Sequence, residues 1–416
     1  MESLIIYEVF PRNHTREGTF QALARDLRRI RLLGADYIWL MPIHPIGKEG
    51  RKGSKGSPYA IQNYLEVHPE LGTLEDFKAL VRQARAEGLK VMIDIVFHHT
   101  ANDALWVKEH PEWYQQFDGK LGRKVADWTD ILDLNLEHPE LQAALIEVLK
   151  FWAQHVDGFR CDVAPLIPLS FWKKAREAVD RVNPDMIWLA ETAHPRFIQR
   201  MRAAGYTIHT DPEMHQVFDL TYDYDGFERL ERYLQGEMAL SMLPEYLYVQ
   251  DTLYPDSGAK LRFLENHDQL RAAQLWPCRE QLKQWTAFMF MQKGATLLYA
   301  GQEYALEHAP DLFSHDPLDW EHGDASFESF VRQLVRLKKA FPRYPYEVRE
   351  VLQGVVVVQR GNYLGVFNLE QKRGMLPLQI RGIDKLSGQR VESTPEGFRV
   401  SREPQIIHIE QLIWNG

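Results

Sequence analysis

The sequence is poor in cysteine, has no long apolar run, and does not concentrate charge of one sign. Cys161 and Cys278 are the only cysteines among 416 residues, which excludes a disulfide framework and a cysteine metal cluster. No apolar stretch is long and uncharged enough to span a bilayer. The net charge of −9 comes without a basic block, which argues against nucleic acid or a membrane surface as partner. A neutral ligand such as a sugar fits this composition better.

The first ten residues, Met-Glu-Ser-Leu-Ile-Ile-Tyr-Glu-Val-Phe, enter a strand-like run at once. They contain no basic segment, no sustained apolar segment and no cleavage site of the kind found in signal peptides. We therefore expect a cytoplasmic protein. The sequence does not indicate an oligomeric state.

Apolar runs of strand length alternate with amphipathic helical segments along most of the chain. This alternation predicts parallel strands with helical crossovers, and eight such strands predict a (β/α)8 TIM barrel of the α/β class. The predicted strands are residues 4–10, 37–41, 89–97, 156–161, 186–190, 217–221, 261–264 and 295–299. The predicted helices are residues 19–33, 74–87, 140–155, 171–182 and 281–292.

Two interruptions and a change of pattern set the predicted domain limits. A short insertion occupies residues 100–132 after the third strand, and a long connection at 226–260 precedes the seventh. From about residue 341 the helical pattern ends, and short strands are predicted at 354–359, 363–367 and 404–409. We expect a barrel domain at residues 1–340, including the insertion, and a C-terminal antiparallel, sandwich-like β domain at residues 341–416.

Four short stretches place carboxylates and histidines at the ends of separate predicted strands. In a barrel of this kind, chemistry takes place on the loops after the carboxyl ends of the strands, and we expect all the candidate residues there. The stretches are Asp94-Ile-Val-Phe-His-His99, Gly158-Phe-Arg-Cys-Asp162, Trp188-Leu-Ala-Glu191 and Phe263-Leu-Glu-Asn-His-Asp268.

The order and spacing of these stretches resemble glycoside hydrolase family 13, the α-amylase family. Residues 131–135 (Ile-Leu-Asp-Leu-Asn) and 294–301 (Gly-Ala-Thr-Leu-Leu-Tyr-Ala-Gly) resemble two further motifs of that family. Each stretch alone is a weak signal, but together they cover nearly the whole chain. The resemblance implies a retaining enzyme that acts on α-linked glucosides.

The residue types fit that chemistry, because a retaining glycosidase needs a nucleophilic carboxylate and an acid/base about 5–5.5 Å apart. We assign Asp162 as the nucleophile, since Arg160, two positions earlier on a strand, shares its face and favours the ionised form. We assign Glu191 as the acid/base, since the mainly apolar residues 186–190 before it favour the protonated form. The resemblance implies that Asp268 is the third catalytic carboxylate, which supports the oxocarbenium-like transition state.

The resemblance also implies residues that hold the reacting sugar. His99 and His267 would donate hydrogen bonds to its hydroxyls, Tyr59 would stack on the ring, Arg160 would partner the nucleophile and Asp94 would organise these groups. Simpler roles stay open: a strand-end carboxylate seen alone is more often a helix cap or surface ion pair, and Tyr59 could serve packing. Trp106, Trp113 and Trp128 fit the core of the insertion slightly better than sugar subsites.

The sequence departs from the family pattern at positions that bear on calcium and on the acceptor side of the site. His98 stands where many members have an Asn that helps to hold calcium, and imidazole is a poor ligand for that hard ion. A calcium requirement is therefore doubtful, and we expect neither a required cofactor nor a metal site. Pro165 and Leu166 stand where many amylases have a Lys-His pair, which predicts an acceptor side that is less polar or that is built from other loops. Asn63 stands where an Asp is often found.

The sequence thus predicts a glycosidase that cleaves α-1,4 bonds in maltooligosaccharides or related soluble α-glucans through a covalent glucosyl-enzyme intermediate. The oligosaccharide substrate is the expected partner. One alternative is a transglycosylase or isomerase, or a glucosidase acting on sucrose, trehalose or α-1,6-glucosides. An alternative of another class is a non-catalytic sugar-binding protein on an amylase scaffold, which the intact Asp162, Glu191 and Asp268 argue against.

Overall fold

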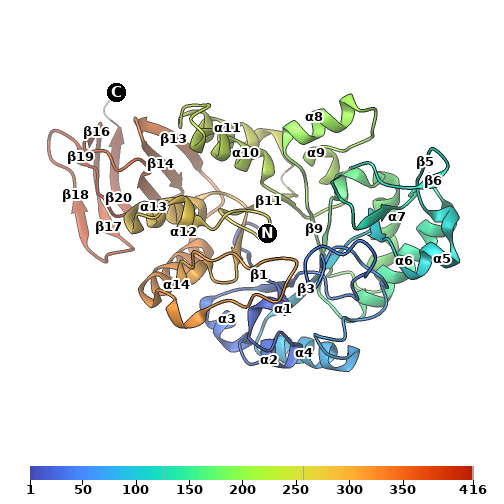
Figure 1. Cartoon of the computed structure of the whole chain (residues 1–416). Helices are drawn as coiled ribbons and strands as arrows, with labels where there is room; N and C mark the ends of the chain where they lie inside the picture. Colours follow the sequence, from blue (N-terminus) through green and yellow to red (C-terminus); the bar gives the residue numbers. More distant parts are fainter. Residues whose placement is uncertain (126, 256, 415–416) are drawn as a thin grey trace. The chain divides into compact units, whose positions relative to one another are not determined.

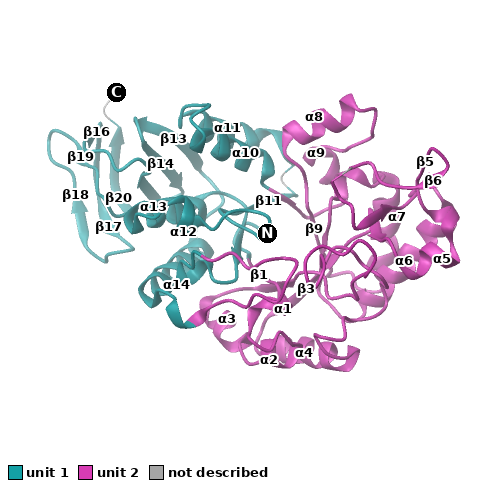
Figure 2. Cartoon of the chain, in the orientation of Figure 1, with its two compact units in different colours: residues 1–5, 223–307, 321–416 teal, residues 6–222, 308–320 magenta. Residues whose placement is uncertain are grey.

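The computed structural model describes residues 1–125, 127–255 and 257–414. Ala126 of the predicted insertion and the last two residues of the predicted C-terminal domain lie outside the described residues. The chain forms two compact units, one of residues 1–5, 223–307 and 321–416, the other of residues 6–222 and 308–320 (Figure 2). The predicted domain limit between residues 340 and 341 stays a prediction.

Eight parallel strands close into a barrel in the order β1-β12-β11-β10-β9-β8-β3-β2, which confirms the predicted (β/α)8 architecture. The barrel strands β1, β3, β9 and β11 are labelled in Figure 1. All eight strands lie almost entirely buried, as expected for parallel strands with both faces covered. The strands are β1 (Ile5–Val9), β2 (Tyr37–Leu40), β3 (Lys90–Ile95), β8 (Gly158–Cys161), β9 (Ile187–Ala190), β10 (Leu220–Tyr222), β11 (Ala259–Arg262) and β12 (Ala295–Tyr299).

Two predicted strands are displaced along the chain. The sixth begins at Leu220 rather than at Val217, because Val217 and Phe218 both donate their N–H groups to the carbonyl of Met214 and so continue the turn that ends α9 (Asp211–Met214). The seventh, β11, begins and ends two residues earlier than the predicted 261–264. The residues expected to follow this strand therefore stand on a longer loop.

The predicted helix at residues 19–33 is two helices, α2 (Phe20–Ala24) and α3 (Leu27–Leu33). The break falls beside Asp26, whose carboxylate lies 2.7 Å from His14 Nε2 and accepts hydrogen bonds from Arg29. A short acidic side chain engaged in this way favours a new helix start over continuation. The remaining helices are α1 (Pro11–His14), α4 (Leu74–Ala86), α5 (Leu105–Glu109), α6 (Pro139–Ala153), α7 (Leu169–Asp180), α8 (Pro195–Ala203), α10 (Tyr224–Leu234), α11 (Met242–Leu253), α12 (Ala272–Leu275), α13 (Arg279–Met291) and α14 (Ala325–Ala340).

The insertion after β3 folds back on the strand that precedes it. Its first strand, β4 (His99–Ala101), pairs antiparallel with β7 (Ile131–Asp133), so that His99 lies opposite Asp133. Between them β5 (Gln116–Phe117) and β6 (Lys120–Leu121) form a small hairpin. Trp128 packs on a buried cluster of Ala60, Ala101 and Ile131. The insertion is therefore held against the barrel by its own small core.

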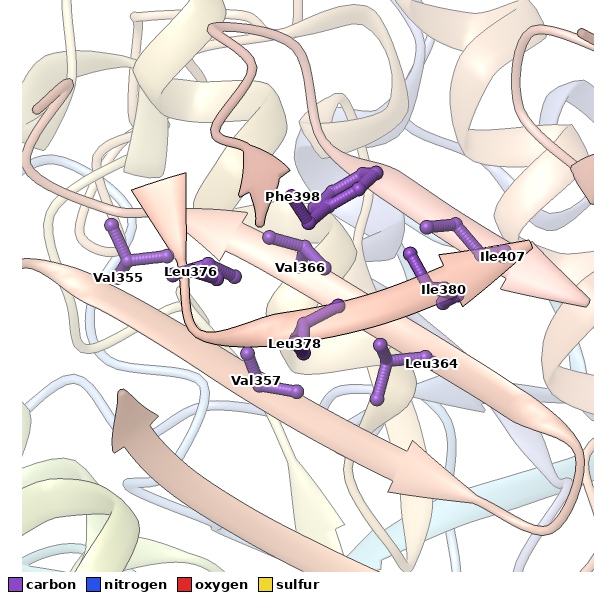
Figure 3. Packing of buried hydrophobic residues seen from close by; sticks show 9 residues of the cluster. All are labelled: Val355, Val357, Leu364, Val366, Leu376, Leu378, Ile380, Phe398 and Ile407. Atoms are coloured by element: carbon purple, nitrogen blue, oxygen red, sulfur yellow. The ribbon is translucent and has the colours of Figure 1, made fainter. Parts of the chain in front are cut away.

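The C-terminal region is antiparallel, as predicted. A six-stranded sheet has the order β13-β14-β15-β20-β17-β18, and β16 pairs separately with β19. Nine buried residues from β14, β15, β16, β17, β19 and β20 form one hydrophobic cluster, in which Leu376 and Phe398 come from the small ribbon (Figure 3). The strands are β13 (Tyr346–Leu352), β14 (Val355–Arg360), β15 (Tyr363–Asn368), β16 (Met375–Leu376), β17 (Leu378–Asp384), β18 (Arg390–Glu392), β19 (Phe398–Arg399) and β20 (Gln405–Trp414).

Candidate active site

Three neighbouring barrel strands, β3, β8 and β9, carry candidate residues of the unit of residues 6–222 and 308–320 at or near their carboxyl ends. Asp162 directly follows β8, and Glu191 directly follows β9. Asp94 and Arg160, however, lie within β3 and β8, where they are partners in the strand register. The expectation that every candidate stands on a loop after a strand is therefore wrong for these two. Both side chains are fully buried, because the last inward positions of a strand point into the barrel rather than to solvent.

Arg160 joins three carboxylates. Its Nη1 donates to Oδ1 of Asp94 at 2.8 Å and to Oδ1 of Asp162 at 2.7 Å, and its Nη2 lies 2.8 Å from Oε1 of Glu191. The planar, rigid guanidinium suits several charge-assisted contacts at once. The structure thereby brings Asp162 and Glu191 together on one cation.

The electrostatic setting keeps Arg160 charged. Burial alone would lower its pKa, but the carboxylates of Asp94, Glu191 and Asp162 outweigh this effect and raise the pKa well above its usual range. The guanidinium carbon also lies 5.1 Å from the ring centre of Trp39 and 5.9 Å from that of Tyr222, distances at which aromatic faces attract cations. A permanent positive charge is thus fixed beside both catalytic candidates.

Tyr59 lies half-buried next to this group. Its hydroxyl donates to Oδ2 of Asp94 at 3.1 Å, and its ring centre lies 5.6 Å from the guanidinium carbon of Arg160. Asp94 therefore connects Tyr59 with Arg160. This arrangement can fix the orientation of the Tyr59 ring, which a stacking platform for a sugar requires.

Sequence reasoning missed the contact between Val163 and Glu191. The N–H of Val163 donates to Oε2 of Glu191 at 2.7 Å. Val163 has φ of +37°, a left-handed backbone that β-branched residues rarely adopt and that tends to occur at functional sites. Because Val163 follows Asp162, this turn ties the segment after the nucleophile to the acid/base. No pattern in the sequence signals a strained backbone at a valine.

His98 and His99 are both buried at the start of the insertion. Their Nδ1 atoms lie 3.2 Å apart, and Nδ1 of His98 lies 3.7 Å from Oδ1 of Asp133. Burial lowers the pKa of His99 to about 4 and that of His98 well below its usual range. Both imidazoles are therefore neutral at pH 7, and His99 can exchange hydrogen bonds with a sugar without adding charge.

The residues around His98 do not fit a calcium ion. Neutral imidazole nitrogen replaces an oxygen donor at this position, and calcium prefers six to eight oxygens. Burial also raises the pKa of the nearby Asp133 carboxyl, which weakens it as an anionic ligand. Within residues 1–125, 127–255 and 257–414, no group of three or more His, Cys, Asp or Glu side chains is arranged to hold a metal.

His267 and Asp268 belong to the other compact unit and follow β11. Nε2 of His267 lies 3.1 Å from Oδ2 of Asp268, whose side chain is 45% exposed, and the N–H of Asp268 donates to Oδ1 of Asn266. The loop is closed by Glu265, which accepts hydrogen bonds from Arg271 at 2.6 Å and from the N–H of Ala272. No pattern in the sequence indicates this buried Glu265–Arg271 pair, since five residues without a period separate its two members.

The segments after Asp162 and Glu191 share an apolar cluster. Leu166, Met201 and Ile208 are buried, and Val163, Phe197 and Tyr206 pack on them. Whether this cluster belongs to the acceptor side, which is expected to be less polar from Pro165 and Leu166, stays a prediction. The ammonium of Lys124, from the insertion, lies 5.4 Å from the ring centre of Tyr206. Two loops that follow different strands thus meet beside the catalytic candidates.

Comparison with known proteins identifies relatives of the whole chain. The model of the alpha amylase catalytic domain matches residues 8–128 and 125–334. The chain is similar to an alpha-amylase from Lactobacillus plantarum (39% identity, TM-score 0.92, 97% of this chain and 98% of that one). It is also similar to a noncanonic maltogenic alpha-amylase, AmyB, from Thermotoga neapolitana (35% identity, TM-score 0.86, 97% and 98%).

The curated relatives are longer proteins. Alpha-amylase MalA from Haloarcula japonica is 27% identical over 369 residues, which are 84% of this chain and 52% of MalA. The alpha-1,4-glucan:maltose-1-phosphate maltosyltransferase of Chlorobaculum tepidum is 37% identical over 293 residues, 62% of this chain and 42% of that enzyme. The chain therefore spans about half the length, or less, of these curated relatives.

Proposed function

Because the chain belongs to the alpha-amylase family, we propose that it is a retaining hydrolase that cleaves α-1,4 bonds in maltooligosaccharides or related soluble α-glucans. The observation that supports this most is the shared Arg160, which contacts both Asp162 and Glu191 at 2.7–2.8 Å. A double-displacement mechanism uses two carboxyl groups that lie close together, and a contact with the same guanidinium keeps Asp162 and Glu191 close. The similarity to two amylases over nearly their full length supports the same activity.

In the proposed mechanism, Asp162 attacks the anomeric carbon while Glu191 protonates the glycosidic oxygen. The C–O bond to the leaving group breaks and a covalent glucosyl-Asp162 ester forms. Glu191, now ionised, takes a proton from water, whose oxygen attacks the same carbon and releases Asp162. Asp268, which follows a strand of the same barrel, is assigned to support the positive charge on the sugar.

The remaining site residues are assigned to binding. His99 and His267 would hydrogen-bond sugar hydroxyls, Tyr59 would stack on the pyranose, and Arg160 and Asp94 would hold Asp162 and Tyr59 in place. No metal is used in this mechanism, since the donors near His98 do not suit calcium. We retain a cytoplasmic location as part of the proposal; no helix among the described residues is long and apolar enough to cross a membrane.

A second candidate is transfer rather than hydrolysis. The covalent intermediate can react with a sugar hydroxyl in place of water, and the 37% identity with a maltosyltransferase favours this alternative. The apolar cluster of Leu166 and Tyr206 offers an acceptor sugar a surface on which to stack. Hydrolysis and transfer therefore differ in what occupies this surface after the first step.

The test is incubation with maltoheptaose, with and without chelator, beside an Asp162→Asn variant, with products separated by chromatography. Shorter maltooligosaccharides from the unmodified protein alone support hydrolysis, and products longer than the substrate support transfer. No change in maltoheptaose would contradict the proposal and lead to assays with sucrose, trehalose and isomaltose.

A further inference from the structure

A cavity lies between α10, α11, α13 and the end of β11. It is partly open and has an empty volume of about 350 Å³, and each of its lining residues is buried. All four elements belong to the unit drawn in teal in Figure 2. None of the proposed catalytic or sugar-binding residues lines this cavity. It is therefore separate from the candidate active site.

The wall of the cavity is mainly apolar. Leu230 lines it from α10, and Leu243 lines it from α11. The rings of Phe227 and Phe263 also line it and stack on each other with their centres 4.6 Å apart. Apolar side chains beside an empty space lose dispersion contacts, and a cavity with such walls takes up small hydrocarbon rings more readily than water. The wall therefore favours a ligand with an apolar ring.

The two charged residues of the lining, Asp223 and Arg262, neutralise each other. Nη1 of Arg262 donates to Oδ2 of Asp223 at 2.6 Å. Gln250 bridges the same pair, since its Oε1 accepts from Arg262 at 2.7 Å and its Nε2 donates to Oδ1 of Asp223 at 2.8 Å. Buried charges are tolerated when they are paired and hydrogen-bonded in this way. A charged ligand would find both groups already paired, so we expect a neutral one.

Gln292, directly after α13, adds a polar side chain to the lining. It is 7% exposed, and its side-chain amide makes no hydrogen bond with any residue that the structure describes. Its backbone carbonyl, in contrast, accepts hydrogen bonds from Lys338 and Arg360. A buried amide normally has a partner, and it can both donate and accept. Gln292 therefore suits a ligand that carries one hydroxyl group.

We infer that this cavity binds a neutral molecule of the phenol class, with one aromatic ring and one hydroxyl. The ring packs against the leucine and phenylalanine side chains of the wall, and the hydroxyl bonds to the amide of Gln292. The volume is at the lower end of the range for ligand sites, which limits the ligand to about one ring. A sugar does not fit, because the apolar wall would leave most of its hydroxyls without partners. The inference does not depend on the proposed glycosidase activity.

The test compares 4-fluorophenol with 4-fluorotoluene, which have nearly the same shape, by fluorine NMR titration of the whole protein. Gln292→Met keeps the length of the side chain and removes the amide. We expect this variant to weaken the affinity for 4-fluorophenol by about threefold to tenfold, the range for one hydrogen bond. The affinity for 4-fluorotoluene should change by less than about twofold, since that probe forms no hydrogen bond with the amide.

A second variant tests the location of the site. In Leu243→Trp, the larger side chain occupies the cavity, so we expect binding of both probes to be lost. Leu253→Trp, on the same helix but 54% exposed and outside the lining, is the matched control and should bind both probes as the unmodified protein does. A thermal melting curve shows that each variant is folded. If Leu243→Trp does not fold, the comparison of the two probes in Gln292→Met still decides.

Three results would overturn the inference. The first is that 4-fluorophenol does not bind to the unmodified protein. The second is binding that a folded Leu243→Trp leaves unchanged, because the probe would then lie elsewhere. The third is an equal effect of Gln292→Met on both probes, because the amide would then not hold the hydroxyl.

Discussion

Nη2 of Arg160 lies 2.8 Å from Oε1 of Glu191, so the proposed proton donor shares its cation with the proposed nucleophile. The other oxygen, Oε2, accepts the N–H of Val163. Oε2 of Glu191 is thus held by a hydrogen bond and Oε1 by an ion pair with the guanidinium before substrate binds. Its orientation is fixed by the backbone of the segment that follows Asp162, which makes the position of the acid dependent on the nucleophile loop.

Replacing Glu191 by Ala should lower kcat on maltooligosaccharides by about 10²- to 10⁴-fold, the usual contribution of general acid–base catalysis. Azide should restore part of the rate on an aryl glucoside with a good leaving group, because that substrate needs no acid and azide replaces the water that Glu191 activates. Glu177→Gln, an exposed position on α7, is the control. Absence of azide rescue in a folded variant would count against the acid/base role.

The sequence was sufficient to predict the barrel and the places of Asp162 and Glu191 directly after two of its strands. Each strand is a short apolar run, and Asp162 and Glu191 directly follow two of these runs. Their positions relative to the strands can therefore be predicted from the order of residues along the chain. The sequence was not sufficient to predict the contact between Arg160 and Glu191, because that contact depends on the register and closeness of β8 and β9. The left-handed backbone of Val163 and the break at Asp26 depend on contacts with residues distant in the chain, and local preference alone gives no sign of them.

Tyr206 should influence the acceptor and not the first chemical step. In Tyr206→Ala, we expect the ratio of transfer to hydrolysis, measured with maltose as acceptor, to fall by about twofold to tenfold, which corresponds to about 0.5–1.5 kcal/mol of lost aromatic contact. The rate of aryl-glucoside cleavage should stay within about twofold. Tyr206→Phe keeps the ring that packs on the apolar cluster and should behave as the unmodified protein; equal loss in both variants would show that the hydroxyl, not stacking, matters.

Buried histidines should make the protein less stable in mild acid. Burial lowers the pKa of His44 to about 4, whereas an unfolded histidine titrates near 6.5. Between these values the unfolded state binds more protons, so the free energy of unfolding falls as pH decreases from about 6.5 to about 4, by about 2 kcal/mol for this residue between pH 7 and pH 5.

Denaturant unfolding of His44→Phe should show this effect directly. The variant should lose about 2 kcal/mol less than the unmodified protein between pH 7 and pH 5, and the aromatic contacts of His44 with Tyr64 and Trp152 favour a ring at this position. His308→Phe, at an exposed histidine, is the control. Equal pH slopes in all three proteins would show that folding does not lower the pKa of His44.

Chelator treatment should leave activity unchanged. The donors around His98 do not suit calcium, and the proposed steps at Asp162 and Glu191 use no metal. The measurement compares the rate on maltoheptaose before and after incubation with EDTA and dialysis. Loss of activity that added calcium restores would contradict this expectation and would place an oxygen-rich site elsewhere in the chain.

The central claim is double displacement at Asp162, and the stereochemistry of the first product tests it most directly. Proton NMR of maltoheptaose hydrolysis should show the α-anomer of the new reducing end first, followed by mutarotation, while Asp162→Asn, folded by its thermal melting curve, produces no reducing ends. Initial release of the β-anomer, or undiminished turnover by Asp162→Asn, would contradict the account.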